Sequence, residues 1–155
     1  MATLEKCLEA LNGQSGPRWG NAEDSLIKPS YLVQQGTAID QIKINAVNTS
    51  AIGVADCDDD HDLNTVYTAG ESVPYWELGS GVDIYVLFDD GTNNVTIERG
   101  WLISPSTSDV GCAMRFAYTD GAMLTDTMYR VIGKPLRKIV ISGDTPTFIL
   151  IRLGL

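Results

Sequence analysis

The sequence has no run of about 18 apolar residues, the length that a transmembrane helix requires. Its first residues, MATLEKCLEALNG, place acidic residues among the apolar ones and so do not resemble the core of a secretory signal peptide. We therefore expect a protein that folds in a cytoplasm and does not enter a membrane. Runs of strong helix formers are scarce, whereas glycine occurs 15 times. This composition favours strands joined by turns.

Histidine and cysteine are also rare, with one histidine and three cysteines. Cys7, Cys57 and Cys112 are far apart and form no C-x-x-C motif, so the sequence contains no zinc knuckle and no redox motif. We interpret them as idle thiols in a reducing compartment. Motifs for nucleotide binding and for a serine nucleophile are absent too. We expect no enzyme and no cofactor, although a pair of catalytic carboxylates remains an alternative because its spacing is spatial.

Basic residues are few, since 11 lysines and arginines stand against 20 acidic residues and the net charge is −9. Binding to nucleic acid relies on cations that neutralise phosphates, so this balance argues against it. The charge is uneven along the chain. Acidic residues outnumber basic ones in residues 53–126, whereas basic residues outnumber acidic ones in residues 131–155. Opposite potentials of this kind could attract copies of the chain to one another and fix how they align. Alternatively, the acidic part is a solvated surface that aids solubility.

The N-terminal residues 1–25 are predicted to form a helix and an arm. Leu4, Leu8 and Leu11 fall on one face of a short helix over residues 3–12. A helix this short is marginal alone, so it must dock either on its own domain or on a neighbouring subunit. Residues 12–25 are rich in Gly, Ser and Asn and are interpreted as an extended arm. Trp19 in this arm either packs on its own domain or contacts a neighbour.

Residues 26–155 are predicted to form one β-rich domain, either a compact β-sandwich or a β-barrel. The evidence is a series of short apolar or alternating segments separated by turn residues. The C-terminal two are predicted to form a hairpin around the turn Gly-Asp-Thr-Pro. The predicted strands are 31–33, 42–46, 51–55, 82–88, 95–103, 112–118, 129–133, 138–142 and 147–153.

The stretch ADCDDDHDLN, residues 55–64, contains five aspartates and the histidine, His61. Calcium binding by an EF-hand loop starting at Asp56 or Asp58 fails, because neither frame has glycine at position 6 or glutamate at position 12. Zinc would need more ligands than His61 and Cys57. We expect His61 to be solvated and its charge to be favoured by the flanking aspartates. The stretch is interpreted as an exposed acidic loop between two strands, with an adventitious divalent cation as the alternative.

The order of segments around this loop carries a resemblance. It runs AIGVADCDDD, VYTAGESVPYWELGSGVDIYVLFDDG, IERGWLISPSTSDVG and YRVIGKPLRKI, followed by a final strand pair. This order resembles the small β-rich proteins of tailed viruses that decorate or cement the capsid, in which a segment of the form iG-x-a-L precedes the last strands. The resemblance covers roughly residues 30–155 and rests on glycine positions and strand rhythm. Residues 1–29 lie outside it.

The resemblance implies a non-enzymatic structural protein on the capsid surface of a virion that is assembled in the host cytoplasm. Its partners would be the major capsid protein and further copies of itself in a homotrimer. We predict Leu4, Leu8, Leu11 and Trp19 as the interface with the neighbouring subunit.

A second hypothesis is a carbohydrate- or receptor-binding β module, assisted by calcium at the aspartates. Its stacking platform would consist of Tyr75, Trp76, Trp101 and Tyr118. Tyr75 and Trp76 are adjacent, so in a strand they face opposite sides and one of them belongs to the core.

Overall fold

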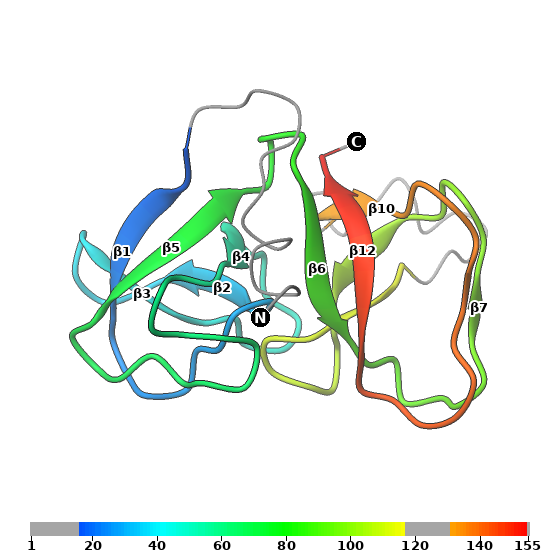
Figure 1. Ribbon diagram of the computed structural model, residues 1–155, viewed down its shortest axis with the longest axis horizontal. Coiled ribbons are helices and arrows are strands. Elements are labelled where there is room, and N and C mark those ends of the chain that lie inside the picture. The colour runs from blue at the N-terminus through cyan, green and yellow to red at the C-terminus, as the bar shows by residue number, and fades with distance from the viewer. Residues whose placement is uncertain (1–15, 117–130, 155) are drawn as a thin grey trace.

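The computed structural model describes residues 16–116 and 131–154, and this part of the chain is all-β, which confirms the predicted fold class (Figure 1). These residues contain no helix that could cross a membrane. The predicted helix over residues 3–12 lies outside the described residues. The described residues form twelve strands: β1 (Arg18–Ala22), β2 (Leu32–Gln35), β3 (Gln41–Ile44), β4 (Gly53–Ala55), β5 (Ser72–Glu77), β6 (Asp83–Phe88), β7 (Thr96–Ile97), β8 (Ile103–Pro105), β9 (Ala113–Arg115), β10 (Gly133–Lys134), β11 (Ile139–Val140) and β12 (Thr147–Leu153).

The strands form two small closed barrels that lie side by side (Figure 1). The first has the strand order β1-β3-β2-β4-β5 and uses the first half of the chain. The second has the order β10-β12-β6-β9-β8, and β11 and β7 form a separate two-stranded sheet. The predicted β-rich region therefore supplies the second barrel and all of the first barrel except β1.

Part of the predicted arm is a strand of the first barrel. Residues Arg18–Ala22 form β1, which pairs antiparallel with β5 and parallel with β3. Gly20 permits this packing, since a Cβ there would come within 2.8 Å of the Ile42 side chain. The segment RWGNA has neither an apolar run nor strict alternation, and its small and polar residues resemble a linker. Its strand conformation comes from the two neighbouring strands that it joins.

Two apolar clusters hold the fold together. Leu32, Val54 and Trp76 are paired across β2, β4 and β5, and they belong to the same cluster as the interior of the second barrel. Because side chains alternate along a strand, their sequence neighbours face the other way, into the first barrel. These neighbours are Val33, Ala55 and Tyr75. The larger cluster therefore extends from the outer side of the first barrel into the second and joins the two.

Backbone hydrogen bonds reinforce this junction. The N–H of Leu32 donates to the carbonyl of Gly111, and the N–H of Gly111 donates to the carbonyl of Asn45, both at 2.9 Å. Gly111 has φ of +71°, and a Cβ there would lie within 3.0 Å of the side chains of Ile44 and Tyr31. Glycine thus permits the close approach of the two barrels at this point.

The predicted C-terminal hairpin does not form. β11 pairs with β7, and β12 pairs with β6 and β10. β12 and β6 are long strands with matching alternation, and six residue pairs join them in register. Two hydrogen bonds between Arg152 and Asp83, at 2.7 and 3.0 Å, fix one end of this pairing. β12 therefore pairs with β6, which is distant in the sequence, and not with β11, its neighbour in the sequence.

Candidate functional site

The acidic loop lies between β4 and β5, as predicted, but its first residue turns into the protein. Asp56 is fully buried. Its Oδ1 accepts a hydrogen bond from the N–H of Cys57 at 2.8 Å, and its Oδ2 accepts one from Nε1–H of Trp76. The hydroxyl of Tyr67 donates to the carbonyl oxygen of Asp56 at 2.6 Å. Asp56 therefore anchors the start of the loop to β5 and to the loop's far end.

Burial also changes the acidity of Asp56. Loss of solvent raises its pKa to about 7, while the hydrogen bonds from Trp76 and Cys57 act in the opposite direction. The carboxyl group thus changes charge near neutral pH, although it is enclosed by the protein. Its titration affects stability, because a buried carboxylate is less favourable than a buried carboxylic acid.

The pH dependence of stability tests this burial. The stabilisation from a group with a raised pKa is complete below its ordinary value, near 3.8, and is lost as pH rises through about 7. We expect the free-energy difference between wild type and Asp56→Asn to shrink from about pH 4 to about pH 8, because asparagine does not ionise. Urea denaturation followed by circular dichroism at several pH values measures it. Asp60→Asn is the control at an exposed carboxylate, and a difference independent of pH for Asp56→Asn contradicts the assignment.

His61 is buried, contrary to the prediction that it is solvated. Its Nδ1 lies 2.7 Å from Oδ1 of Asp58, and its Nε2 lies 3.1 Å from Oε2 of Glu71. The ring stacks on Tyr67 with the centroids 4.0 Å apart. Burial lowers the pKa of His61, but the hydrogen bonds and charges of Asp58 and Glu71 outweigh it and hold the pKa above its ordinary value. His61 therefore connects Asp58, near the start of the loop, with Glu71 at its end.

These contacts limit the chemistry of the loop. Both ring nitrogens of His61 face carboxylates, so neither faces a hydroxyl or thiol group that it could activate. Within residues 16–116 and 131–154, no group of three or more His, Cys, Asp or Glu side chains is placed to hold a metal ion. Asp59 and Asp60 are exposed at the tip, and no described cation forms an ion pair with either. The loop is thus a rigid support for two exposed negative charges.

Of the predicted interface residues, the structure describes only Trp19. Leu4, Leu8 and Leu11 lie outside the described residues. Trp19 is on β1, opposite Pro74 of β5, and 59% of its surface is exposed. It therefore projects from the surface of the first barrel, and its contact with a neighbouring subunit stays a prediction.

The aromatic residues of the carbohydrate hypothesis lie in different places. Trp76 is buried in the core, so it is not available for stacking on a ligand, while Tyr75 packs against the interior of the first barrel. This confirms that one of the two adjacent aromatics is a core residue. Trp101 is 47% exposed, and Tyr118 lies outside the described residues. The described aromatic residues do not form one exposed platform.

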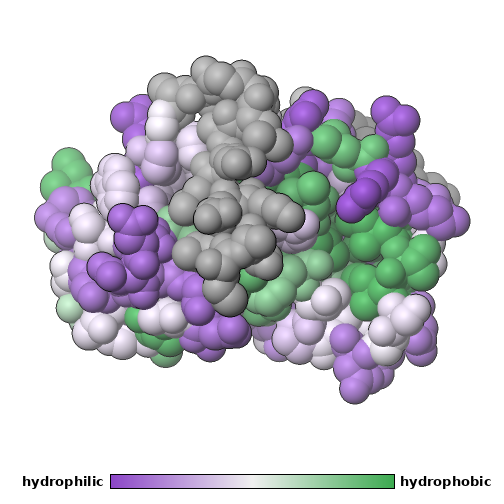
Figure 2. All heavy atoms as spheres, in the orientation of Figure 1, coloured by the Kyte–Doolittle hydropathy of each residue, from purple (hydrophilic) through white to green (hydrophobic). Residues whose placement is uncertain are grey.

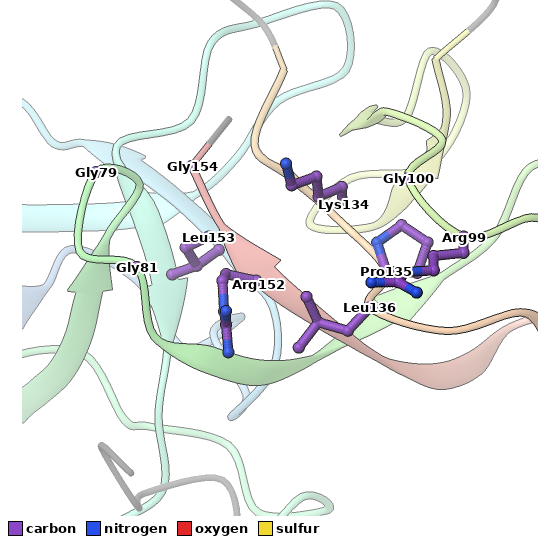
Figure 3. Close-up of a pocket in the computed structure, with 10 residues that line it drawn as sticks. All are labelled: Gly79, Gly81, Arg99, Gly100, Lys134, Pro135, Leu136, Arg152, Leu153 and Gly154. Atoms are coloured by element: carbon purple, nitrogen blue, oxygen red, sulfur yellow. The ribbon is translucent and has the colours of Figure 1, made fainter. Parts of the chain in front are cut away.

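The second barrel has a pocket of about 580 Å³ that the sequence did not predict (Figure 3). Three cationic side chains line it, Arg99, Lys134 and Arg152, together with four glycines, Gly79, Gly81, Gly100 and Gly154. Arg152 is paired with Asp83, whereas no carboxylate among the described residues forms an ion pair with Arg99 or Lys134. Lys134 and Arg152 extend to opposite sides of the pocket in Figure 3. The positive charge is therefore spread around the pocket and not focused on one point.

The sequence indicated only some of the cationic residues that line this pocket. The basic C-terminal segment contains Lys134 and Arg152, but Arg99 belongs to the acidic half of the chain. Arg99 reaches the pocket because the turn between β7 and β8 lies beside β10, where the N–H of Gly100 donates to the carbonyl of Pro135 at 3.2 Å.

The outer face of the β6–β12 pair is a second candidate surface. Tyr85 is paired with Leu150, and Leu87 is paired with Phe148, so two apolar cross-strand pairs lie next to each other. Phe148 is 37% exposed, and the other three side chains are half-buried. Figure 2 shows hydrophobic surface gathered over the second barrel, where β6 and β12 lie in Figure 1. We name these four residues the apolar face.

Comparison of the sequence with models of known protein families and with curated proteins found no match.

Proposed function

We propose that the chain is a non-enzymatic structural protein of a virion, which binds the outside of a viral capsid and stabilises contacts between major capsid subunits. The resemblance in glycine positions and strand rhythm suggests the capsid as the binding surface. The apolar face is the observation that carries the binding role. Contiguous apolar surface on a folded domain is typical of a site that another protein covers.

The geometry of the apolar face suits a rigid contact. Its four side chains stand on the longest strand pair of the protein, and the opposite side of that pair forms the core of the second barrel. A partner that covers the face removes apolar surface from water, at about 25 cal/mol per Å². Because the strands are already ordered, little conformational entropy is lost on binding.

Trp19 offers a second contact on the first barrel. Tryptophan is enriched among the residues that contribute most to protein–protein binding. Here it projects from β1, which begins seven residues after Leu11, the last of the three predicted interface leucines. We propose that this N-terminal segment reaches a neighbouring subunit and that Trp19 marks the point where it leaves the barrel.

Attachment to capsid particles tests the proposal. Particles purified from the source are expected to contain this chain in a fixed ratio to the major shell protein after washing, measured by mass spectrometry. We expect Phe148→Asp to reduce the ratio by at least about tenfold, because a carboxylate in a buried apolar contact is desolvated. Removal of residues 1–15 is expected to reduce it as well while β1, and thus the barrel, stays intact.

Ile39→Asp is the matched control, because Ile39 is 98% exposed in a turn of the first barrel. It is expected to leave the ratio unchanged. Absence of the wild-type chain from washed particles would overturn the proposal. Equal attachment of Phe148→Asp and Ile39→Asp would show that the apolar face is not the surface that binds the capsid.

A further inference from the structure

We propose that copies of this chain associate head to tail, with the tip of the acidic loop of one copy held in the basic pocket of the next. The inference goes beyond the proposed function, which makes no statement about association between copies of this chain. It assigns an occupant to the pocket: the exposed Asp59 and Asp60 of a second copy.

Charge complementarity is the first argument. The protein has a net charge of −9, yet its pocket gathers Arg99 and Lys134 without a described carboxylate partner. The two aspartates at the loop tip are likewise without a described cation. Unpaired charges of opposite sign on two surfaces attract one another and define which surfaces meet.

The distribution of charge in the pocket is the second argument. A single small anion is bound most tightly when cations converge on one point, as bidentate arginine contacts do. Here Lys134 and Arg152 extend away from each other (Figure 3), and Arg152 is already engaged by Asp83. Adjacent carboxylates on a loop match such a spread of positive charge. This favours an acidic protein segment over one phosphate or sulfate ion.

The rigidity of the loop is the third argument. Asp56 fixes its start, and His61 joins Asp58 to Glu71 at its end. The two exposed aspartates therefore stand on an ordered base, which reduces the entropy that binding removes.

The position of loop and pocket requires two copies. The loop belongs to the first barrel and lies at its lower end in Figure 1, whereas β10 and the end of β12 lie at the top of the second barrel. A loop that fills a pocket thus joins one molecule to another. The contact uses two different surfaces, so it repeats, and it closes into a ring if the rotation between copies permits.

Charge reversal tests the contact in solution, without particles, by sedimentation velocity. Wild type is expected to associate at about 50 mM salt and to dissociate at about 500 mM. The pocket variant Arg99→Glu with Lys134→Glu, and the loop variant Asp59→Lys with Asp60→Lys, are each expected to weaken association about tenfold or more. The chain with all four substitutions is expected to associate again, because both surfaces are reversed together.

Arg137→Glu is the matched control, since Arg137 is an exposed cation outside the pocket. It is expected to associate like wild type, and circular dichroism checks that every variant is folded. A monomeric wild type at low salt, or failure of the four substitutions to restore association, overturns the inference. A pocket variant that associates normally but has lost phosphate binding in calorimetry also overturns it, because the pocket then serves a small anion.

The two proposals fail separately. A chain that stays monomeric in solution but attaches to particles overturns only the head-to-tail contact. A chain that associates through the pocket but is absent from washed particles overturns only the capsid function.

Discussion

Gly133→Ala is expected to lower the free energy of unfolding by about 3 kcal/mol, a loss at the upper end of those seen for overpacking. Gly133 lies in β10 between β12 and β8, where it is paired with Leu153 and Ile103. A Cβ at this position would overlap the carbonyl oxygen of Arg152. This oxygen belongs to the backbone of a paired strand, so it cannot move away by a rotamer change as a side-chain atom could. The second barrel must separate two strands to admit one methyl group.

Urea denaturation followed by circular dichroism measures this loss. Gly79→Ala is the matched control, because a Cβ at Gly79 meets no atom within 4 Å. A surface change of that kind is expected to alter stability by no more than about 0.5 kcal/mol. Equal stabilities for the two variants would show that β10 is not packed against β12 as described. The same glycine stands in the segment VIGKPL that carries part of the resemblance.

Trp76→Ala is expected to have the largest effect of all, a loss of about 3–5 kcal/mol. Trp76 is 3% exposed and belongs to the cluster that joins the two barrels. Its removal leaves a cavity at the junction and takes away the indole N–H that donates to the buried carboxyl of Asp56. A buried acceptor that loses its donor adds to the cost of the cavity.

Two matched variants separate these contributions. Trp76→Phe keeps an aromatic ring in the core but removes the N–H, so it is expected to cost about 1–3 kcal/mol. Trp19→Ala makes the same change as Trp76→Ala at a side chain that is 59% exposed, and it is expected to cost less than about 1 kcal/mol. Chemical denaturation measures all three. A loss for Trp19→Ala as large as that for Trp76→Ala would contradict the assignment of core and surface.

The sequence predicted strands best where a long apolar segment lies between turn residues. Residues 82–88 and 147–153 were both predicted, because each is rich in β-branched and aromatic residues and is bounded by a turn. Their pairing with each other was missed, since the hairpin prediction assumed that neighbours in sequence pair. Segment 18–22 was missed for a different reason: two neighbouring strands make it a strand, and its own residues contain no β pattern.

The candidate sites depend even more on contacts distant in sequence. The aspartates next to His61 suggested a solvated ring, but Glu71, ten residues away, and the stacked Tyr67 enclose it. The pocket combines four separate segments, and no local pattern links Arg99 to Lys134. The division into two barrels could not be predicted either. Leu32 and Val54 are apolar, and an apolar residue fits equally well inside its own barrel or against a neighbouring one.

The position of β12 in the second barrel determines the order in which the protein can fold as it is synthesised. The strands of the first barrel all lie within residues 18–77, so this barrel can close early. β6 pairs with β9 only at Phe88 and Ala113, and its main partner, β12, follows about 65 residues further along the chain. At ordinary rates of translation that delay is about 3–13 s. During it, the inner face of β6 and the side of the first barrel that contains Trp76 both lack their cover, so the nascent chain presents to chaperones, or to other nascent chains, the surface that later becomes its core.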